Sequence, residues 1–218
     1  ISKGNSLMIF YQLLIEWNKV MNLTGITEYG EGWKSIFVDS LSLVEVLNIE
    51  NVNYVIDVGT GAGFSGIPFE DLHFPHLRIT LLDSLNKRIK FLDTIIKELG
   101  LKDIYTIHGR AETFARQAEY RENMIYGFKA VANLATLSEY CLPYIRVGGM
   151  FVSYKSGNID KEISESEKAV QILGGELEDI YKFQLPGTDI GRSFVKINKI
   201  KSTGKKFPRK QFTSRATK

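Results

Sequence analysis

The sequence has few of the side chains that staple a small domain or bind a structural metal. Its 218 residues include one cysteine, Cys141, and three histidines, His73, His76 and His108. A single thiol excludes a disulfide within the chain and is typical of a reducing compartment. A structural zinc site needs cysteine and histidine ligands at short spacings, and these residues are scattered. We therefore expect no metal.

Long apolar runs are also missing. No stretch reaches the roughly 18 consecutive apolar residues that a membrane span requires. The first residues lack the basic-then-apolar pattern of a signal peptide, so we expect a soluble, cytoplasmic protein that does not bind membranes. The length suits one main domain with appendages.

Acidic residues are absent from the end of the sequence. Residues 201–218 contain seven lysines and arginines, whereas the rest of the chain holds all 25 acidic residues and the other 21 basic ones. A mildly acidic body with a basic end points to a polyanionic partner bound by that end. The same composition suits a solubilising, disordered terminus. Charge alone leaves both interpretations open.

Apolar periodicity changes once along the chain. Residues 7–21 and 34–47 show the three- and four-residue spacing of helices, and they precede any strand pattern. From residue 53 short buried runs alternate with helices, of which 86–99 should end at Gly100. The predicted strands are 54–58, 78–82, 104–107, 124–128, 150–154, 178–185 and 193–200, and the further helices are 134–142 and 160–173.

This order predicts an α/β fold around a mostly parallel sheet. Only a short region around Pro186 and Gly187 separates the last two strands, so they should pair antiparallel. We divide the chain into an N-terminal helical cap (1–50), a sheet domain (51–200) and a basic C-terminal tail (201–218).

The most informative segment runs from Asp57 to Gly66, where the first strand turns into a helix. Glycine permits positive φ and lets the backbone approach a ligand closely, and ligands of such sheets bind beyond the carboxyl ends of the strands. Asp83 ends the second strand, where a carboxylate can accept hydrogen bonds from ribose hydroxyls. These residues predict a site for an adenosine-containing cofactor.

Two cofactors fit this pattern. The spacing Gly61-x-Gly63-x-x-Gly66 matches the dinucleotide fingerprint, so an NAD-dependent oxidoreductase stays open as an alternative. Asp57, two residues before Gly59, would repel a pyrophosphate and suits a cationic sulfonium. The terminal hairpin also departs from a dinucleotide fold, which repeats its parallel half. Both features favour S-adenosyl-L-methionine.

Several motifs resemble those of one family. They are Trp17-Asn18-Lys19, Asn22-Leu23-Thr24, Asp39-Ser40, IDVGTGAGFSGIP (56–68), LLDSLNKRIKFL (81–92), GRAE (109–112), AVANLATLSEYCLP (130–143) and FPRK (207–210). The chain thereby resembles the 16S rRNA (guanine-N7)-methyltransferase family, also called the glucose-inhibited division protein B family. The resemblance implies a Rossmann-like, seven-stranded fold that uses S-adenosyl-L-methionine to methylate guanine N7, at guanine 527 in the family. The substrate would be 16S ribosomal RNA, the small ribosomal subunit or its precursor.

The resemblance assigns roles to individual residues. Lys129 and Arg192 would be catalytic, because cations there can grip phosphates or the O6/N7 edge of guanine. The cofactor would be bound by Asp57, Gly59, Gly61, Gly63, Phe64, Asp83, Ser84, Ala111, Glu112 and Lys129. RNA would be bound by Arg110, Lys155 and Arg192, and the charge of the basic tail adds Lys206, Arg209 and Lys210 to this group.

The sequence departs from the family pattern at several positions. Lys129 stands where the family has arginine, Ile36 where it has histidine, and Met124 where it has aspartate. Lysine keeps the charge of arginine but loses its bidentate fork. These changes motivate a second alternative, a catalytically weak RNA-binding protein on a methyltransferase fold.

Overall fold

The computed structural model describes residues 3–21, 23, 42–45, 52–68, 77–129, 132–156, 159–184, 189 and 191–210. The strands in these ranges are β1 (Tyr54–Val58), β2 (Arg78–Asp83), β3 (Ile104–His108), β4 (Met124–Lys129), β5 (Ile145–Ser156), β6 (Gly175–Gln184) and β7 (Gly191–Lys199). The helices are α1 (Lys3–Met21), α4 (Asn86–Leu99), α5 (Ala111–Phe114), α6 (Leu134–Cys141) and α7 (Asp160–Ile172), with 3-10 turns η1 (Ser42–Glu45) and η3 (Leu142–Tyr144). Of the predicted helix 34–47, only η1 lies among the described residues.

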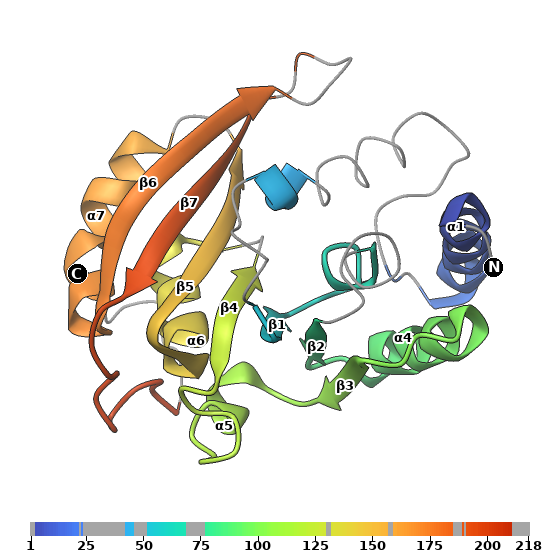
Figure 1. Cartoon of the computed structure of the whole chain (residues 1–218), viewed down its shortest axis with the longest axis horizontal. Helices are drawn as coiled ribbons and strands as arrows, with labels where there is room; N and C mark the ends of the chain where they lie inside the picture. The colour runs from blue at the N-terminus through green and yellow to red at the C-terminus, as the bar shows by residue number, and fades with distance from the viewer. Residues whose placement is uncertain are drawn as a thin grey trace.

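All seven strands form one sheet, in the order β3-β2-β1-β4-β5-β7-β6 (Figure 1). Strands β1 to β5 pair in parallel, whereas β7 is antiparallel to both β5 and β6. The predicted α/β fold, with a mostly parallel sheet and a terminal antiparallel hairpin, is confirmed.

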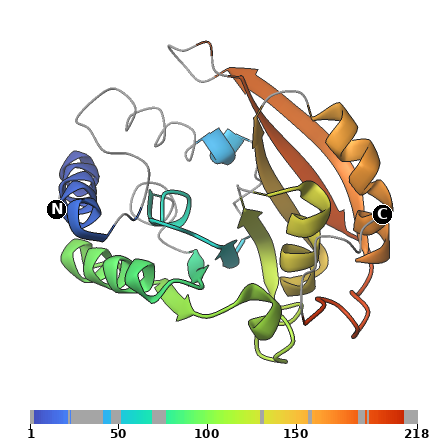
Figure 2. The same cartoon turned by 180° about the vertical axis from the view of Figure 1, so that it is seen from behind.

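Helices cover both faces of the sheet. Neighbouring residues of a strand point to opposite faces, so Val55 packs with α1 and α4 while Ile56 packs with α6 and α7. Helix α1 lies beside α4 in both views (Figures 1 and 2), and Phe10 and Trp17 of α1 contact Phe91 of α4 at ring-centroid distances of 6.2 and 5.7 Å. Because residues 46–51 lie outside the described part of the chain, the predicted domain boundary near residue 50 stays a prediction.

Glycines mark the end of one helix and an irregularity in one strand. Gly100 has a left-handed φ of 67° and closes α4, as predicted. Gly148 and Gly149 precede the predicted strand 150–154, but both lie inside β5, where its register against β4 shifts. A Cβ on Gly149 would collide with the carbonyl of Ile125. Strand β5 therefore begins earlier than predicted, because these glycines allow it to bulge against β4.

The direction of the strands defines two sides of the sheet. The carboxyl side is the rim where β1 to β5 end, and the amino side is the rim where they begin. Strand β7 points the opposite way from β4 (Figure 1), so the chain after Lys199 continues on the amino side.

Candidate cofactor site

The glycine turn after β1 lies on the carboxyl side. The N–H groups of Gly59 and Thr60 donate to the Leu82 carbonyl at 2.7 and 3.0 Å, which ties the turn to the end of β2. Gly59, Gly61 and Gly63 have φ values of 72°, 63° and 81°, which L side chains rarely adopt. The backbone therefore turns sharply at this point, as the sequence predicts.

Two of these glycines have different surroundings. A Cβ on Gly63 would lie only 2.5 Å from Cδ2 of Leu92, so glycine at this position allows the turn to pack against α4. A Cβ on Gly61 would have no atom within 4 Å. The space next to Gly61 is therefore open to a ligand that approaches the backbone.

Asp57 stabilises the turn from within. It is 4% exposed, and its Oδ2 accepts a hydrogen bond of 2.7 Å from the Thr60 hydroxyl. This bond connects the end of β1 to the loop that follows. A contact between Asp57 and a cofactor stays a prediction.

Asp83 is a buried carboxylate with three donors. It is 2% exposed; its Oδ1 accepts from the N–H of Leu85 at 2.9 Å, and its Oδ2 accepts from the N–H of Gly61 at 2.9 Å and from Nη1 of Arg88 at 3.2 Å. A carboxylate offers about four acceptor positions, so Oδ1 can accept one more hydrogen bond. Arg88 supplies the opposite charge that a buried carboxylate needs.

The chain after β3 passes beside Asp83. The N–H of Gly109 donates to the Asp83 carbonyl at 2.9 Å, and Ala111 and Glu112 then begin α5. Glu112 is 8% exposed, and its Oε1 accepts from Nε of Arg110 at 2.6 Å. This hydrogen bond raises the pKa of Arg110, whose side chain is 72% exposed. The structure thus brings Ala111 and Glu112 to the same rim as Asp83.

The structure describes the other predicted residues of this rim to different extents. Phe64 packs edge-on against Phe10 of α1 at a centroid distance of 5.8 Å, and Ser84 is exposed. The side chain of Lys129 lies outside the described residues. Arg192 is half-buried and lies opposite Ser156, the last residue of β5, so it is on the carboxyl side.

Lys155 is already engaged within the protein. Its side chain is 8% exposed, and its Nζ donates to Oε1 of Glu162 at 2.6 Å and to the Ala132 carbonyl at 2.5 Å. The same Glu162 oxygen accepts from the N–H of Leu134. Lys155 therefore fixes the beginning of α6, and its contact with RNA stays a prediction.

The predicted cations of the C-terminal tail lie on the amino side. Lys206 and Lys210 are exposed. Arg209 pairs with Glu139 of α6 instead: Nη2 to Oε2 is 2.6 Å and Nε to Oε1 is 2.9 Å. The structure therefore separates the residues predicted to bind RNA into two groups, and Arg110, Lys155 and Arg192 form the group on the carboxyl side.

Sequence reasoning did not identify the charged partners of the predicted residues, which are Arg88 for Asp83, Glu162 for Lys155, and Glu139 for Arg209. Arg88 follows Asp83 by five residues and lies in the first turn of α4, which is a usable local signal. Glu139 and Arg209 are 70 residues apart, and no local pattern connects them.

Two kinds of feature are absent from the residues that the structure describes. No three histidine, cysteine, aspartate or glutamate side chains there come together as a metal site. Within the same part of the chain, no helix has the length and apolar character needed to cross a bilayer.

Comparisons with known proteins identify relatives of the chain. Residues 3–190 match the family described as rRNA small subunit methyltransferase G. The ribosomal RNA small subunit methyltransferase G of Lachnoclostridium phytofermentans is 50% identical over 92% of this chain and 83% of that protein. The protein of the same name from Clostridium novyi is 46% identical over 97% and 87%, respectively.

Solved structures of lower identity share the fold. TYW2 of M. jannaschii, solved in complex with AdoMet, superimposes with a TM-score of 0.58 at 14% identity, over 81% of this chain and 80% of that chain. TrmN from Thermus thermophilus gives a TM-score of 0.57 at 14% identity, over 74% of this chain and 48% of that chain.

Proposed function

Because the chain belongs to the rRNA small subunit methyltransferase G family, we propose that it transfers a methyl group from S-adenosyl-L-methionine to guanine N7 in 16S ribosomal RNA, at guanine 527. The observation that carries the cofactor assignment is the meeting of the glycine turn with Asp83, where Gly61 donates to the carboxylate at 2.9 Å. Membership of the family supports ribosomal RNA as the substrate.

The residues at this rim fit an adenosyl cofactor. The open space next to Gly61 admits a ligand close to the backbone, and Asp83 can accept a ribose hydroxyl at Oδ1. A second hydroxyl would take the position that Arg88 occupies on Oδ2. We assign Ala111 and Glu112 to the adenine, and Asp57, Gly59, Gly63, Phe64 and Ser84 to the rest of the cofactor.

Guanine N7 needs little acid or base catalysis, because it has an in-plane lone pair and no proton to remove. S-adenosyl-L-methionine supplies an electrophilic methyl group on a cationic sulfur. The protein's contribution is then to hold N7 in line with that group, and such positioning can supply ~7–11 kcal/mol. We propose that Lys129 and Arg192 do this by contacting phosphates or the O6/N7 edge of guanine.

The alternative of a catalytically weak RNA-binding protein rests on departures from the family pattern. One of them, Met124, is 7% exposed and lies opposite Ile145 where β4 and β5 begin. It is therefore a core residue of the amino side, far along β4 from the proposed cofactor. Ile36 lies outside the described residues, and Lys129 keeps its positive charge.

A methyl-transfer assay tests the proposal against both alternatives. We expect calorimetry to detect binding of S-adenosyl-L-methionine, and tritium from the labelled cofactor to appear on guanine N7 of unmethylated 16S rRNA or small subunits. Binding of NADH with no methyl transfer would favour the oxidoreductase. RNA binding without transfer would favour the catalytically weak protein.

A further inference from the structure

Helix α5 has too few residues to hold its own position. It contains four residues, Ala111–Phe114, and an isolated helix of one turn is not stable. Its first residues, Ala111 and Glu112, border the adenine in the function proposed above. The position of this backbone must therefore be fixed by the rest of the molecule.

Tyr144 of η3 fixes the beginning of α5. Its side chain is fully buried, with 0% exposed, and its hydroxyl donates to the Ala111 carbonyl at 2.6 Å. The N–H of Ala115 donates to the same Ala111 carbonyl at 3.0 Å. Burial raises the pKa of Tyr144, so the hydroxyl keeps its proton and remains a donor to Ala111.

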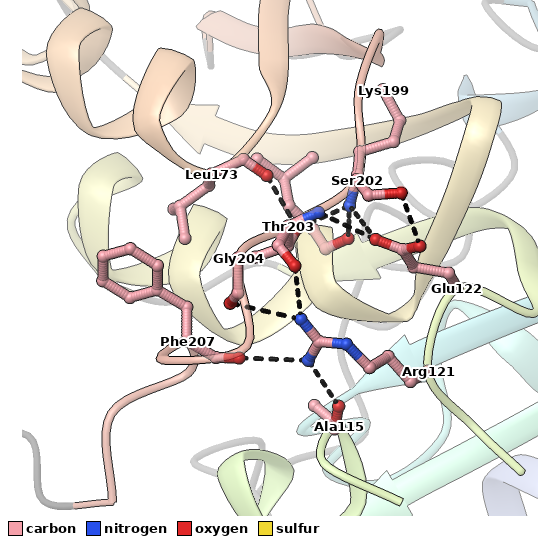
Figure 3. A network of polar contacts seen from close by, with 10 residues as sticks. Ala115, Arg121, Glu122, Leu173, Lys199, Ser202, Thr203, Gly204 and Phe207 are labelled. Atoms are coloured by element: carbon pink, nitrogen blue, oxygen red, sulfur yellow. Dashed lines mark hydrogen bonds and ion pairs between the residues drawn. The ribbon is translucent and has the colours of Figure 1, made fainter. Parts of the chain in front are cut away.

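Arg121 fixes the end of α5 (Figure 3). Its Nη1 donates to the Ala115 carbonyl at 3.1 Å and to the Phe207 carbonyl at 3.0 Å. Its Nη2 donates to the carbonyls of Thr203 at 2.6 Å and Gly204 at 3.3 Å. One guanidinium thus connects α5 to the chain that follows β7.

That chain is itself anchored to the body of the protein. The N–H of Thr203 donates to Oε1 of Glu122 at 2.8 Å, and the Thr203 hydroxyl donates to the Leu173 carbonyl at 2.7 Å. Further along, Arg209 forms its ion pair with Glu139. The carbonyls after β7 that accept hydrogen bonds from Arg121 therefore belong to a segment that the rest of the protein holds in place.

We propose that Tyr144 and Arg121 are positioning residues of the cofactor site, because they hold the α5 backbone where Ala111 and Glu112 meet the adenine. This inference rests on the function proposed above. The Tyr144 side chain is buried in the core, and Arg121 bonds to the segment that follows β7 on the amino side of the sheet. Both residues therefore act on the site through α5 and do not contact the cofactor themselves.

The substitution Tyr144→Phe removes the hydroxyl and keeps the ring. We expect the Kd and KM for S-adenosyl-L-methionine to rise roughly three- to tenfold, the range that follows from losing one hydrogen bond of ordinary net strength. The kcat at saturating cofactor and the Kd for 16S rRNA should not change, which a general loss of folding would not reproduce. Tyr105→Phe, which removes an exposed hydroxyl from β3, is the matched control and should bind as the wild type does.

A second variant keeps the test decisive if Tyr144→Phe folds poorly. Arg121→Gln should weaken cofactor binding in the same way, Arg121→Lys should restore part of it, and the amide of Ala115 should exchange its hydrogen faster in Arg121→Gln. Wild-type affinity in a folded Tyr144→Phe or Arg121→Gln protein would overturn this inference and leave the proposed function standing. A wild-type protein that does not bind S-adenosyl-L-methionine would overturn the proposed function, and the inference with it.

Discussion

The two sides of the sheet hold their irregular chain in different ways. Around the glycine turn on the carboxyl side, backbone N–H groups make the main contacts: those of Gly59 and Thr60 bond the Leu82 carbonyl, and those of Gly61 and Leu85 bond Asp83. On the amino side long side chains reach across, and Arg121 alone donates to four carbonyls (Figure 3).

The difference has a separate physical reason on each side of the sheet. Glycine lets the carboxyl side turn without filling space, so the space next to Gly61 stays open to a ligand. On the amino side the irregular chain after β7 leaves carbonyls that need donors, and arginine and lysine side chains supply them. A loss on the carboxyl side should therefore reduce activity, whereas a loss on the amino side should reduce stability, except at Arg121, whose contact with Ala115 also reaches α5.

The largest effect is expected from Asp83→Asn on the carboxyl side. The amide turns one acceptor oxygen into a donor that faces Gly61, Leu85 or Arg88, and hydrogen bonds to a charged group contribute about 1.5–3 kcal/mol each. We expect kcat/KM for methyl transfer to fall by about 1000-fold, a loss of about 4 kcal/mol. Asp93→Asn, an exposed carboxylate on α4, is the control. Retention of wild-type cofactor affinity in Asp83→Asn would contradict the assignment of the ribose.

On the amino side, Arg209→Ala should mainly reduce stability. It leaves the carboxylate of Glu139, whose side chain is 4% exposed, without its charged partner, and breaking a buried pair in this way costs about 3–5 kcal/mol. Because the Arg209 side chain is 29% exposed, water can reach the site, and we expect the lower end of that range. Urea unfolding measures the effect. Lys210→Ala, next in the chain and exposed, should change the free energy of unfolding by less than about 0.5 kcal/mol.

The sequence predicts local features of the sheet well and long-range pairing poorly. Apolar runs predicted β1 to β4 to within one residue at each end, Gly100 predicted the end of α4, and the glycine turn with Asp83 predicted the rim of the proposed site. Each of these depends on residues close together in the chain. The pairing of Arg209 with Glu139 depends on how the whole sheet folds. The charge of the tail therefore suggested a polyanionic partner and did not reveal that Arg209 pairs within the protein.

Lys199 offers a pH-dependent comparison within the amino side. Its side chain is 0% exposed, and burial lowers its pKa from 10.5 to about 8, although Glu122 partly opposes this shift. Between pH 8 and pH 10.5 the unfolded chain binds the extra proton, so the free energy of unfolding rises with pH in this window.

The measurement compares the wild type with Lys199→Met. At about 1.4 kcal/mol per pKa unit, the stability of the wild type relative to the variant should rise by about 3 kcal/mol across the window. Taking the difference removes the titration of tyrosines, which both proteins share. If the free energies of unfolding of the two proteins differ by the same amount at pH 8 and at pH 10.5, Lys199 keeps its ordinary pKa.

The smallest effect is expected from the two exposed lysines of the amino side, and it decides whether RNA reaches that side at all. Deletion of the basic segment would be a poor test, because Arg121 and Glu139 would lose their partners as well. Lys206→Gln with Lys210→Gln removes two charges and keeps the backbone carbonyls.

For each phosphate that the protein no longer neutralises, the slope of log K against log salt should become shallower by about 0.7–0.9. We therefore expect a change of up to about 1.8 for 16S rRNA in the double variant, with kcat unchanged. Lys97→Gln on α4 should leave the slope as it is. If the double variant keeps the wild-type slope while Arg110→Gln makes it shallower, RNA contacts the carboxyl side alone. The basic end of the chain then serves the fold through Arg209.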